Sequence, residues 1–395
     1  MNKKSILLIS NGHGEDIIAA NLLKELFKIN NEIKVKVLPI VGVGKAYESL
    51  PVDIIGPLKS LPSGGFMRNS LSNFLGDIKA GLLGITIEQI KAISKVKDEV
   101  DLVIPVGDVF ILILAGLFTN KKIVFIPTAK SEYISGHYWI EKFLMKKMVE
   151  IVLPRDKKTA QVLQESGVNA RFVGNAMMDC FEINDLDFCI KDDSKVVGIL
   201  PGSREEAYVN IKFILRIINK LEQLEFQKMD FLVAMASNLS IDRLKKVIYG
   251  TDWNIVESSS TEKNLGIYLK LISPCEKSVI RIIYHHFGDV LNKSDIFIGL
   301  AGTANEQAVG MGKPLISFPG EGSQFTEKFA LAQRSLLGKS VSLIERDPQK
   351  IASKVKFVLN NKEVYNTMSR IGKKRMGKTG GIKAMVDIII KYLNL

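Results

Sequence analysis

Cysteine is scarce in this sequence. Only Cys180, Cys189 and Cys275 occur among 395 residues, and none belongs to a C-x-x-C pair. An odd number of isolated cysteines argues against a disulfide framework and a zinc ribbon, and it is typical of proteins from a reducing compartment. We therefore expect a cytoplasmic protein without a structural metal.

Long apolar runs are also missing. The best candidate, FILILAGLF from Phe110, falls well short of the roughly 18–20 residues that a membrane-spanning helix needs. The amino-terminal segment is basic and then apolar, but Gly12, His13 and Glu15 soon interrupt it. A first strand therefore fits better than a signal peptide, and we expect no spanning segment.

Several catalytic and metal-binding patterns are absent. The chain has four histidines and no G-x-S-x-G elbow, which disfavours a serine hydrolase. His285 and His286 are adjacent and point apart on any regular element, while Asp185 and Asp187 lie in an acidic stretch that we interpret as solvated. We expect neither a metal ion nor a cofactor.

Negative charge is under-represented, and the formal net charge is +12. Such an excess favours anionic partners, namely phosphates, an anionic membrane surface or nucleic acid, although solvated lysines alone would also produce it. Nucleic acid is the least favoured partner, because the chain has neither zinc-finger spacing nor an aromatic-rich RNA-binding signature.

Strand-like and helix-like segments alternate along the chain. Short continuous apolar runs are typical of parallel strands covered on both faces. They begin at Ser5, Lys34, Asp101, Lys122, Glu150 and Ala170, and again at Lys195, Met229, Val279, Asp295 and Lys313. An acidic, aperiodic segment separates the two sets. We predict an α/β protein with domains at 1–178 and 194–378, a linker at 179–193 and a carboxyl-terminal helix at 379–395.

The first candidate site follows the first predicted strand, in the segment ISNGHGED. Gly12 and Gly14 allow a tight turn and a close approach to a ligand, and His13 projects between them. Glu15 and Asp16 suit the positive end of the helix that we expect to begin near Asp16. A plain glycine-rich turn is the alternative, and no third glycine supports a dinucleotide fingerprint.

Asp108 is the second candidate. It lies between a predicted strand and the apolar run from Val109. Such a carboxylate can cap the helix, act as a general base, or do both.

The third candidate is the segment VGILPGSREE, in which a strand stops at Pro201. Gly202 and Ser203 would offer backbone N–H groups and a hydroxyl at a helix start, which is an anion-binding arrangement. Arg204 adds donors that suit a phosphate. The alternative is an ordinary capped helix with an arginine in solvent.

The fourth candidate begins after the strand DIFIGL. Gly302, Thr303 and Ala304 would expose N–H groups to a second phosphate, so that the pair of turns predicts a nucleotide diphosphate. Glu306 and Gln307 in the first helical turn could bind ribose hydroxyls, although Glu306 could instead only compensate the helix dipole.

A P-loop pattern also occurs, from Gly372 to Thr379. A true P-loop follows a buried strand, whereas the preceding segment here is polar with helical spacing. We interpret this match as a basic turn between helices.

The segments LPGSREE and GTANEQAVGMGKPLI, with the amino-terminal glycine loop, resemble the lipid-A-disaccharide synthase-related proteins over nearly the whole chain. The resemblance implies a GT-B fold, with two Rossmann-like parallel-sheet domains facing across a cleft and a carboxyl-terminal helix crossing back to the first. It also implies metal-free, inverting transfer of an N-acetylglucosamine-type sugar from a UDP-sugar to a lipid-like acceptor.

Three departures from that family concern the substrate. NGHGED stands where the synthase has a Gly-Glu-x-Ser-Gly-Asp pattern, and Asp108 lacks the usual neighbouring proline and Phe-Asn pair. The ribose-binding glutamate falls on Gln307, with Glu306 one place earlier. Asp108 is the favoured base and His13 the alternative, with Gly12, Gly14 and Glu15 on the acceptor side.

Two other functions stay open on the same scaffold: a UDP-N-acetylglucosamine 2-epimerase-like isomerase and a non-catalytic UDP-sugar-binding protein. Residues 61–68 combine Leu61, Phe66 and Met67 with Arg68 in a glycine-broken loop. We expect this loop to contact an anionic membrane peripherally.

Overall fold

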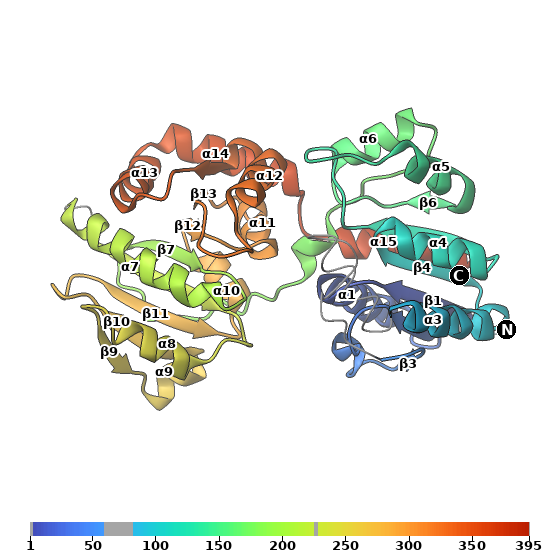
Figure 1. Ribbon diagram of the computed structural model, residues 1–395, viewed down its shortest axis with the longest axis horizontal. Helices are drawn as coiled ribbons and strands as arrows, with labels where there is room; N and C mark the ends of the chain where they lie inside the picture. Colours follow the sequence, from blue (N-terminus) through green and yellow to red (C-terminus); the bar gives the residue numbers. More distant parts are fainter. Residues whose placement is uncertain (1–2, 59–81, 225–227, 395) are drawn as a thin grey trace. The chain divides into compact units, whose positions relative to one another are not determined.

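The computed structural model describes residues 3–58, 82–224 and 228–394 of the chain (Figure 1). These residues form two units. Unit 1 comprises residues 1–180 together with 378–395, and unit 2 comprises residues 181–377. The chain therefore leaves unit 1, builds unit 2 and returns to unit 1 with its last helix.

Unit 1 contains a parallel sheet with the strand order β3-β2-β1-β4-β5-β6. The expected strand at Ala170 is wrong, because Ala170 forms only an isolated bridge to Val152. The two-residue β3 has no long apolar run and was not predicted. The strands are β1 Ser5–Ser10, β2 Lys34–Pro39, β3 Asp53–Ile54, β4 Leu102–Gly107, β5 Lys122–Pro127 and β6 Ile151–Val152.

Helices cover both faces of this sheet. Alternate residues of β1 enter different cores: Ile6 and Leu8 pack with α1 and α15, whereas Leu7 and Ile9 pack with α3, α4 and α5. Both faces of the sheet are therefore buried, which explains why its strands are continuous apolar runs in the sequence. The helices are α1 His13–Ile29, α3 Leu82–Val96, α4 Val109–Phe118, α5 Trp139–Met148, α6 Lys157–Glu165 and α15 Gly381–Leu393.

The return of α15 to unit 1 confirms the expected carboxyl-terminal helix. Asp179 accepts hydrogen bonds from the backbone N–H groups of Gly380 (2.6 Å) and Ile382 (2.8 Å) at the start of this helix. Gly174 has φ +135°, and any Cβ there would collide with the backbone of Gly381. Close backbone contact therefore fixes where α15 begins.

Unit 2 contains a larger sheet with the order β14-β13-β12-β7-β8-β11-β10-β9. Its five apolar strands were predicted, whereas the antiparallel β9 and β10 and the short β14 were not. β10 alternates buried and half-buried residues, so it lacks a continuous apolar run. The strands are β7 Lys195–Leu200, β8 Met229–Met235, β9 Asn254–Glu257, β10 Ile267–Ile272, β11 Val279–Tyr284, β12 Ile296–Gly299, β13 Leu315–Ser317 and β14 Val341–Leu343.

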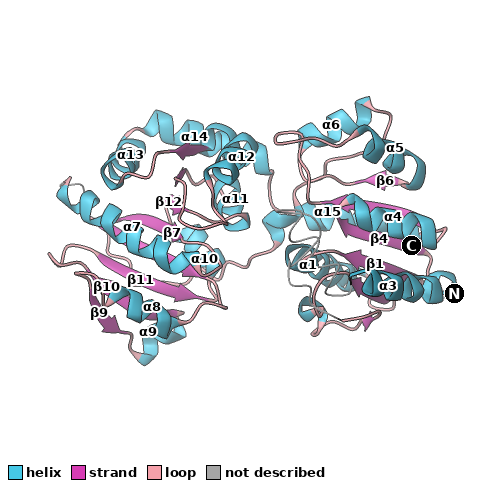
Figure 2. Cartoon of the chain, viewed as in Figure 1, coloured by secondary structure: helices cyan, strands magenta, loops and turns pink. Residues whose placement is uncertain are grey.

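The helices of unit 2 pack around this sheet, as Figure 2 shows by secondary structure. The core joins α7 and α13 to the strands through residues such as Ile214, Ile218 and Val355. The helices are α7 Glu206–Gln223, α8 Ile241–Ile248, α9 Ser260–Asn264, α10 Phe287–Lys293, α11 Thr303–Gly310, α12 Glu327–Leu337, α13 Pro348–Asn360 and α14 Lys362–Met376.

The segment that the sequence assigns to a linker is anchored to unit 2 from Phe181 onward. Asp289, which is fully buried, accepts from the backbone N–H of Asn184 at 2.8 Å. Asp230 accepts from the N–H of Lys191 at 3.1 Å and pairs with the buried Arg281 at 2.5 Å. Hydrogen bonds to two buried aspartates therefore hold the backbone of this largely exposed segment against unit 2.

Candidate functional site

Two strand-to-helix turns leave the sheet of unit 2 side by side. Strands β7 and β12 are parallel neighbours, with Leu200 opposite Gly299. Gly202, in the turn after β7, has φ +107°, and a Cβ there would lie 3.3 Å from the carbonyl oxygen of Leu300. Glycine therefore allows the two turns to approach each other closely.

Ser203 and Arg204 are exposed in the β7–α7 turn. The helix α7 itself begins at Glu206, slightly later than Ser203. Among the described residues, no backbone hydrogen bond from the N–H of Ser203 or Arg204 is present, and no side chain caps this helix. These donors and the guanidinium are therefore available to an anion.

The β12–α11 turn likewise leaves the start of its helix without a side-chain cap. Gly302 occupies the N-cap of α11 and supplies no side-chain cap, while Thr303 is exposed and Ala304 is half-buried. Glu306 lies in the first helical turn and is half-buried, whereas Gln307 is only 5% exposed. Uncapped N–H groups at helix starts attract phosphates through their partial positive charge.

Amide side chains that were not predicted from the sequence hold both turns in place, namely the buried Gln333 and the exposed Asn238. Gln333 of α12 donates to the carbonyl oxygens of Ala301 (3.0 Å) and Gly302 (3.1 Å), and its own oxygen accepts from Asn305 (2.8 Å). Asn238 donates to the carbonyl of Ser203 at 2.9 Å. An amide at an apolar-face position of the helix around Gln333 was the available sequence signal, whereas nothing in the sequence marked Asn238.

The acceptor-side candidates of unit 1 follow β1. Helix α1 begins at His13, earlier than the expected Asp16, so His13 and Gly14 are exposed in its first turn. Gly12 is the buried N-cap residue. Glu15 is half-buried and accepts from the hydroxyl of Thr128 at 3.0 Å, which links this turn to the end of β5.

Asp108 caps helix α4. Its Oδ1 accepts from the backbone N–H of Phe110 at 2.9 Å, and its carboxyl group also bonds the side chain of Asn11. Burial raises the pKa of Asp108 despite these hydrogen bonds, and the nearby Glu15 adds to the rise. A carboxyl group with a raised pKa is a better proton acceptor than an exposed aspartate.

His13, in the β1–α1 turn, lies beside the loop that follows β2. A Cβ on Gly42, in the loop after β2, would approach the His13 ring to 3.0 Å. Because β2, β1, β4 and β5 are consecutive parallel strands, their carboxyl ends gather His13, Glu15, Asp108 and Thr128 at one edge of the sheet. Asn11 and Thr128 were missed by the sequence analysis.

A buried polar chain supports the β1–α1 turn. Ser10 donates to Asp16 at 2.5 Å, and the Ser10 and Tyr47 hydroxyl oxygens lie 2.7 Å apart. Burial raises the pKa of Asp16 to about 6, against the lowering effects of the Ser10 hydrogen bond and of His13. Asp16 lies in the first turn of α1, as expected, but its burial was not predicted from the sequence.

The P-loop-like segment does not open a helix. Gly372 lies inside α14, which ends at Met376, and Gly377 is its carboxyl-terminal cap. A Cβ on Gly372 would collide with the carbonyl of Val309, so close helix packing explains this glycine. The carboxyl end of a helix carries partial negative charge and repels phosphate.

The loop at residues 61–68 lies outside the described residues. Of the helices that the structure does describe, none combines the length and apolarity needed to cross a bilayer. Within residues 3–58, 82–224 and 228–394, no three His, Cys, Asp or Glu side chains gather closely enough to hold a metal ion.

Comparisons with known proteins show the fold. No family model and no curated protein sequence matches the chain. Among solved structures, a UDP-GlcNAc 2-epimerase from Neisseria meningitidis bound to UDP-GlcNAc aligns with a TM-score of 0.56 and 17% identity over 98% of this chain and 100% of its own. The calicheamicin glycosyltransferase CalG4 aligns with a TM-score of 0.61 and 16% identity over 100% and 99%.

A UDP-glucosyltransferase from Polygonum tinctorium aligns with a TM-score of 0.60 and 11% identity over 100% of this chain and 99% of its own. Each of these alignments spans nearly the whole of both chains. The expected fold class is confirmed: the chain has a GT-B fold.

Proposed function

We propose that the chain binds the diphosphate of a UDP-sugar at the β7–α7 and β12–α11 turns of unit 2 and transfers the sugar to an acceptor hydroxyl. The observation that carries the proposal is the pair of uncapped, glycine-containing turns on neighbouring strands. A diphosphate has two anionic groups, and each helix start offers N–H donors to one of them.

Arg204 would stabilise the departing UDP. Its side chain is exposed, and no ion pair involves it among the described residues. Charge grows on the diphosphate as the glycosidic bond breaks, so a guanidinium beside it stabilises the transition state more than the ground state. Glu306 and Gln307 are the proposed contacts to ribose.

Unit 1 would supply the base. Asp108 would accept the proton of the acceptor hydroxyl, because its raised pKa brings it nearer to the working pH. The exposed His13 is the alternative base, and Gly12, Gly14 and Glu15 would line the acceptor side. Attack on the face opposite to UDP would invert the anomeric centre without a metal.

The resemblance to lipid-A-disaccharide synthase-related proteins supports an N-acetylglucosamine-type donor and a lipid-like acceptor. A second candidate is a UDP-N-acetylglucosamine 2-epimerase-like reaction, favoured by the full-length likeness to an epimerase bound to UDP-GlcNAc. A transferase consumes an acceptor and releases UDP, whereas an epimerase changes only the configuration at carbon 2 of the sugar.

The test incubates the purified chain with a panel of UDP-sugars, with and without an extract of membrane lipids. Release of UDP that depends on the lipid extract supports the transferase. A new UDP-sugar epimer without acceptor supports the epimerase. Calorimetry that detects no binding of UDP or any UDP-sugar contradicts the proposal as a whole.

A further inference from the structure

Helix α5 of unit 1 presents large apolar side chains to solvent. Trp139 is 78% exposed, Phe143 50% and Ile140 43%, and Tyr138, immediately before the helix, is 68% exposed. Helical periodicity places Trp139, Ile140 and Phe143 on one side, opposite the buried Met145. Scattered single apolar residues on a surface are ordinary, but four such side chains within six positions form a patch.

The same face is basic. Lys146 and Lys147 are exposed and Lys142 is half-buried, and all three flank the apolar side chains. Among the described residues, no ion pair involves these three lysines. The acid of this helix, Glu141, turns away to Lys130, whose Nζ lies 2.7 and 2.8 Å from its two carboxylate oxygens. The patch therefore carries uncompensated positive charge.

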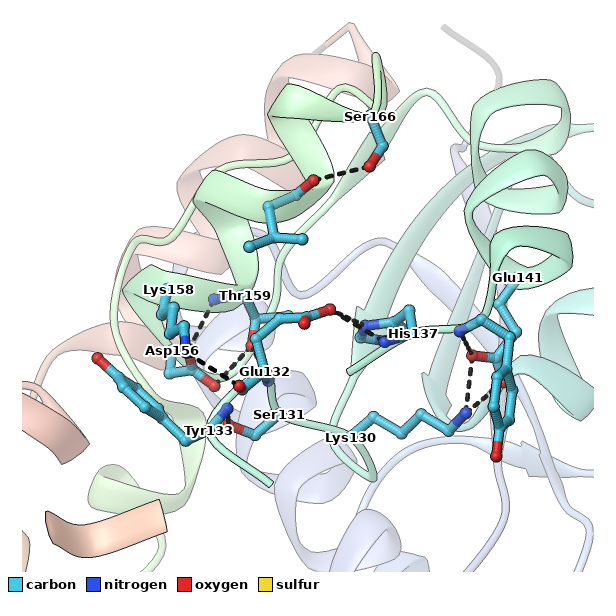
Figure 3. Close-up of polar contacts among 12 residues, drawn as sticks. Lys130, Ser131, Glu132, Tyr133, His137, Glu141, Asp156, Lys158, Thr159 and Ser166 are labelled. Atoms are coloured by element: carbon cyan, nitrogen blue, oxygen red, sulfur yellow. Dashed lines mark hydrogen bonds and ion pairs between the residues drawn. The ribbon is translucent and has the colours of Figure 1, made fainter. Parts of the chain in front are cut away.

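The turn that leads into α5 is fixed by polar contacts, as Figure 3 shows. Glu132 accepts from the backbone N–H of His137 at 2.9 Å, and its own N–H donates to Thr159 of α6 at 3.0 Å. Lys130 also lies 3.9 Å from the centre of the Tyr138 ring. The aromatic side chains are thus presented by a preformed scaffold.

Apolar side chains flanked by lysines match the boundary region of an anionic bilayer. Tryptophan and tyrosine favour the headgroup level, and lysines are attracted to anionic lipid heads while their stems cover apolar surface. We propose that this α5 face (Tyr138, Trp139, Ile140, Phe143, Lys142, Lys146 and Lys147) docks peripherally onto an anionic lipid surface. The helix lies in the interface plane and does not cross the bilayer.

This docking surface differs from residues 61–68 and does not rest on the proposed UDP-sugar chemistry. Vesicle binding is measured without nucleotide, so its failure leaves the diphosphate site untouched. A chain that fails to bind UDP but binds vesicles would contradict only the proposed function.

The experiment mixes the full chain with vesicles of phosphatidylglycerol and phosphatidylcholine, or of phosphatidylcholine alone. The chain has two tryptophans, and Trp253 is only 5% exposed, so a change in fluorescence reports mainly on Trp139. We expect a blue shift and quenching by brominated lipid only with the anionic vesicles, and weaker binding at high salt.

Matched variants locate the surface. Trp139→Ser/Phe143→Ser and, separately, Lys142→Gln/Lys146→Gln/Lys147→Gln should each reduce co-sedimentation at least tenfold. Tyr249→Ser/Phe357→Ser replaces two exposed aromatic side chains of unit 2 and should bind as the unchanged chain does. Circular dichroism checks that each variant is folded.

Absence of binding by the unchanged chain at low salt would overturn the proposal. Equal binding by the Trp139→Ser/Phe143→Ser variant would do the same. The proposal would also be overturned if these substitutions converted a dimer into a monomer in sedimentation analysis while vesicle binding was unaffected. A second copy of the chain would then cover this face.

Discussion

At the scale of single residues, Asp108 combines a structural and a chemical role. As the N-cap of α4 it accepts from the N–H of Phe110, an interaction that favours the charged form. Burial acts in the opposite direction and dominates, so the pKa of Asp108 is raised. The residue is therefore held in one orientation and is still able to take a proton.

Asp108→Asn separates these roles. Asparagine is as good an N-cap as aspartate, so the stability of unit 1 should change little, whereas an amide cannot accept the proton. We expect UDP affinity to be unchanged and turnover to fall by about 10²–10⁴-fold, the usual contribution of general base catalysis. Asp347→Asn, the same change at the N-cap of α13, is the control and should leave turnover unchanged. Near-normal turnover of Asp108→Asn would mean that Asp108 is only a cap.

Arg204→Ala tests the diphosphate site. Hydrogen bonds to a charged group contribute about 1.5–3 kcal/mol, so UDP affinity should fall roughly ten- to a hundredfold in calorimetry. Arg216→Ala removes an exposed arginine further along the same helix and should leave UDP affinity unchanged. Equal affinities of the two folded variants would rule out a contact between Arg204 and the diphosphate.

At the scale of elements, the β1–α1 turn contains a buried carboxyl group, Asp16, whose charged form is disfavoured by burial. Asp16 is 3% exposed in the first turn of α1, where it bonds Ser10 of β1. Its pKa is about 6 in the folded chain, against an ordinary value of 3.8. Because the folded state binds the proton more tightly, this group stabilises the fold most at pH values below 3.8, and the contribution is lost as the pH rises through 6.

Asp16→Asn should remove this pH dependence. Between pH 4.5 and 7.5 the unchanged chain should lose about 2 kcal/mol of unit 1 stability relative to the variant, as an order of magnitude, from a pKa difference of roughly two units. Urea unfolding at both pH values measures the difference. Asp53→Asn, at an exposed position, should show the same pH dependence of stability as the unchanged chain. If the stability of Asp16→Asn changed with pH as much as that of the unchanged chain, a raised pKa of Asp16 would be contradicted.

At the scale of the whole molecule, the two units are interlaced along the chain. The helix α15 follows unit 2 in sequence, yet Met385, Val386 and Ile389 complete the core beneath α1. Unit 1 therefore cannot finish its core until the last residues of the chain are in place.

Ile389→Ala should weaken unit 1 selectively. Ile389 is fully buried, so the change should cost about 2–5 kcal/mol. Hydrogen exchange should accelerate at amides of β1 and α1 while β7 and β12 keep their protection. Ile351→Ala, at a fully buried position of α13 in unit 2, should give the reverse pattern. Equal loss of protection in both units after either substitution would show that they unfold together.

The fold class was predictable because parallel strands buried on both faces leave continuous apolar runs in the sequence. Strands without such runs were missed, as with β9 and β10, and the apolar run at Ala170 forms only a bridge. Turn residues such as Gly202 and Asp108 were identified because their chemistry is local. Whether they bind a sugar nucleotide stays a prediction.

The sequence by itself determined the succession of two α/β units, the carboxyl-terminal helix and the glycine-containing turns, since periodicity and turn chemistry act over a few neighbouring residues, whereas the return of that helix to unit 1 was implied only by the family resemblance. Only the tertiary structure decided that Gln333 supports the Gly302 turn, that burial raises the pKa of Asp16, and that α5 exposes Trp139 beside lysines. Burial and hydrogen bonding between distant segments depend on packing. Packing depends on contacts between segments far apart in the sequence, so it cannot be predicted from any short segment alone.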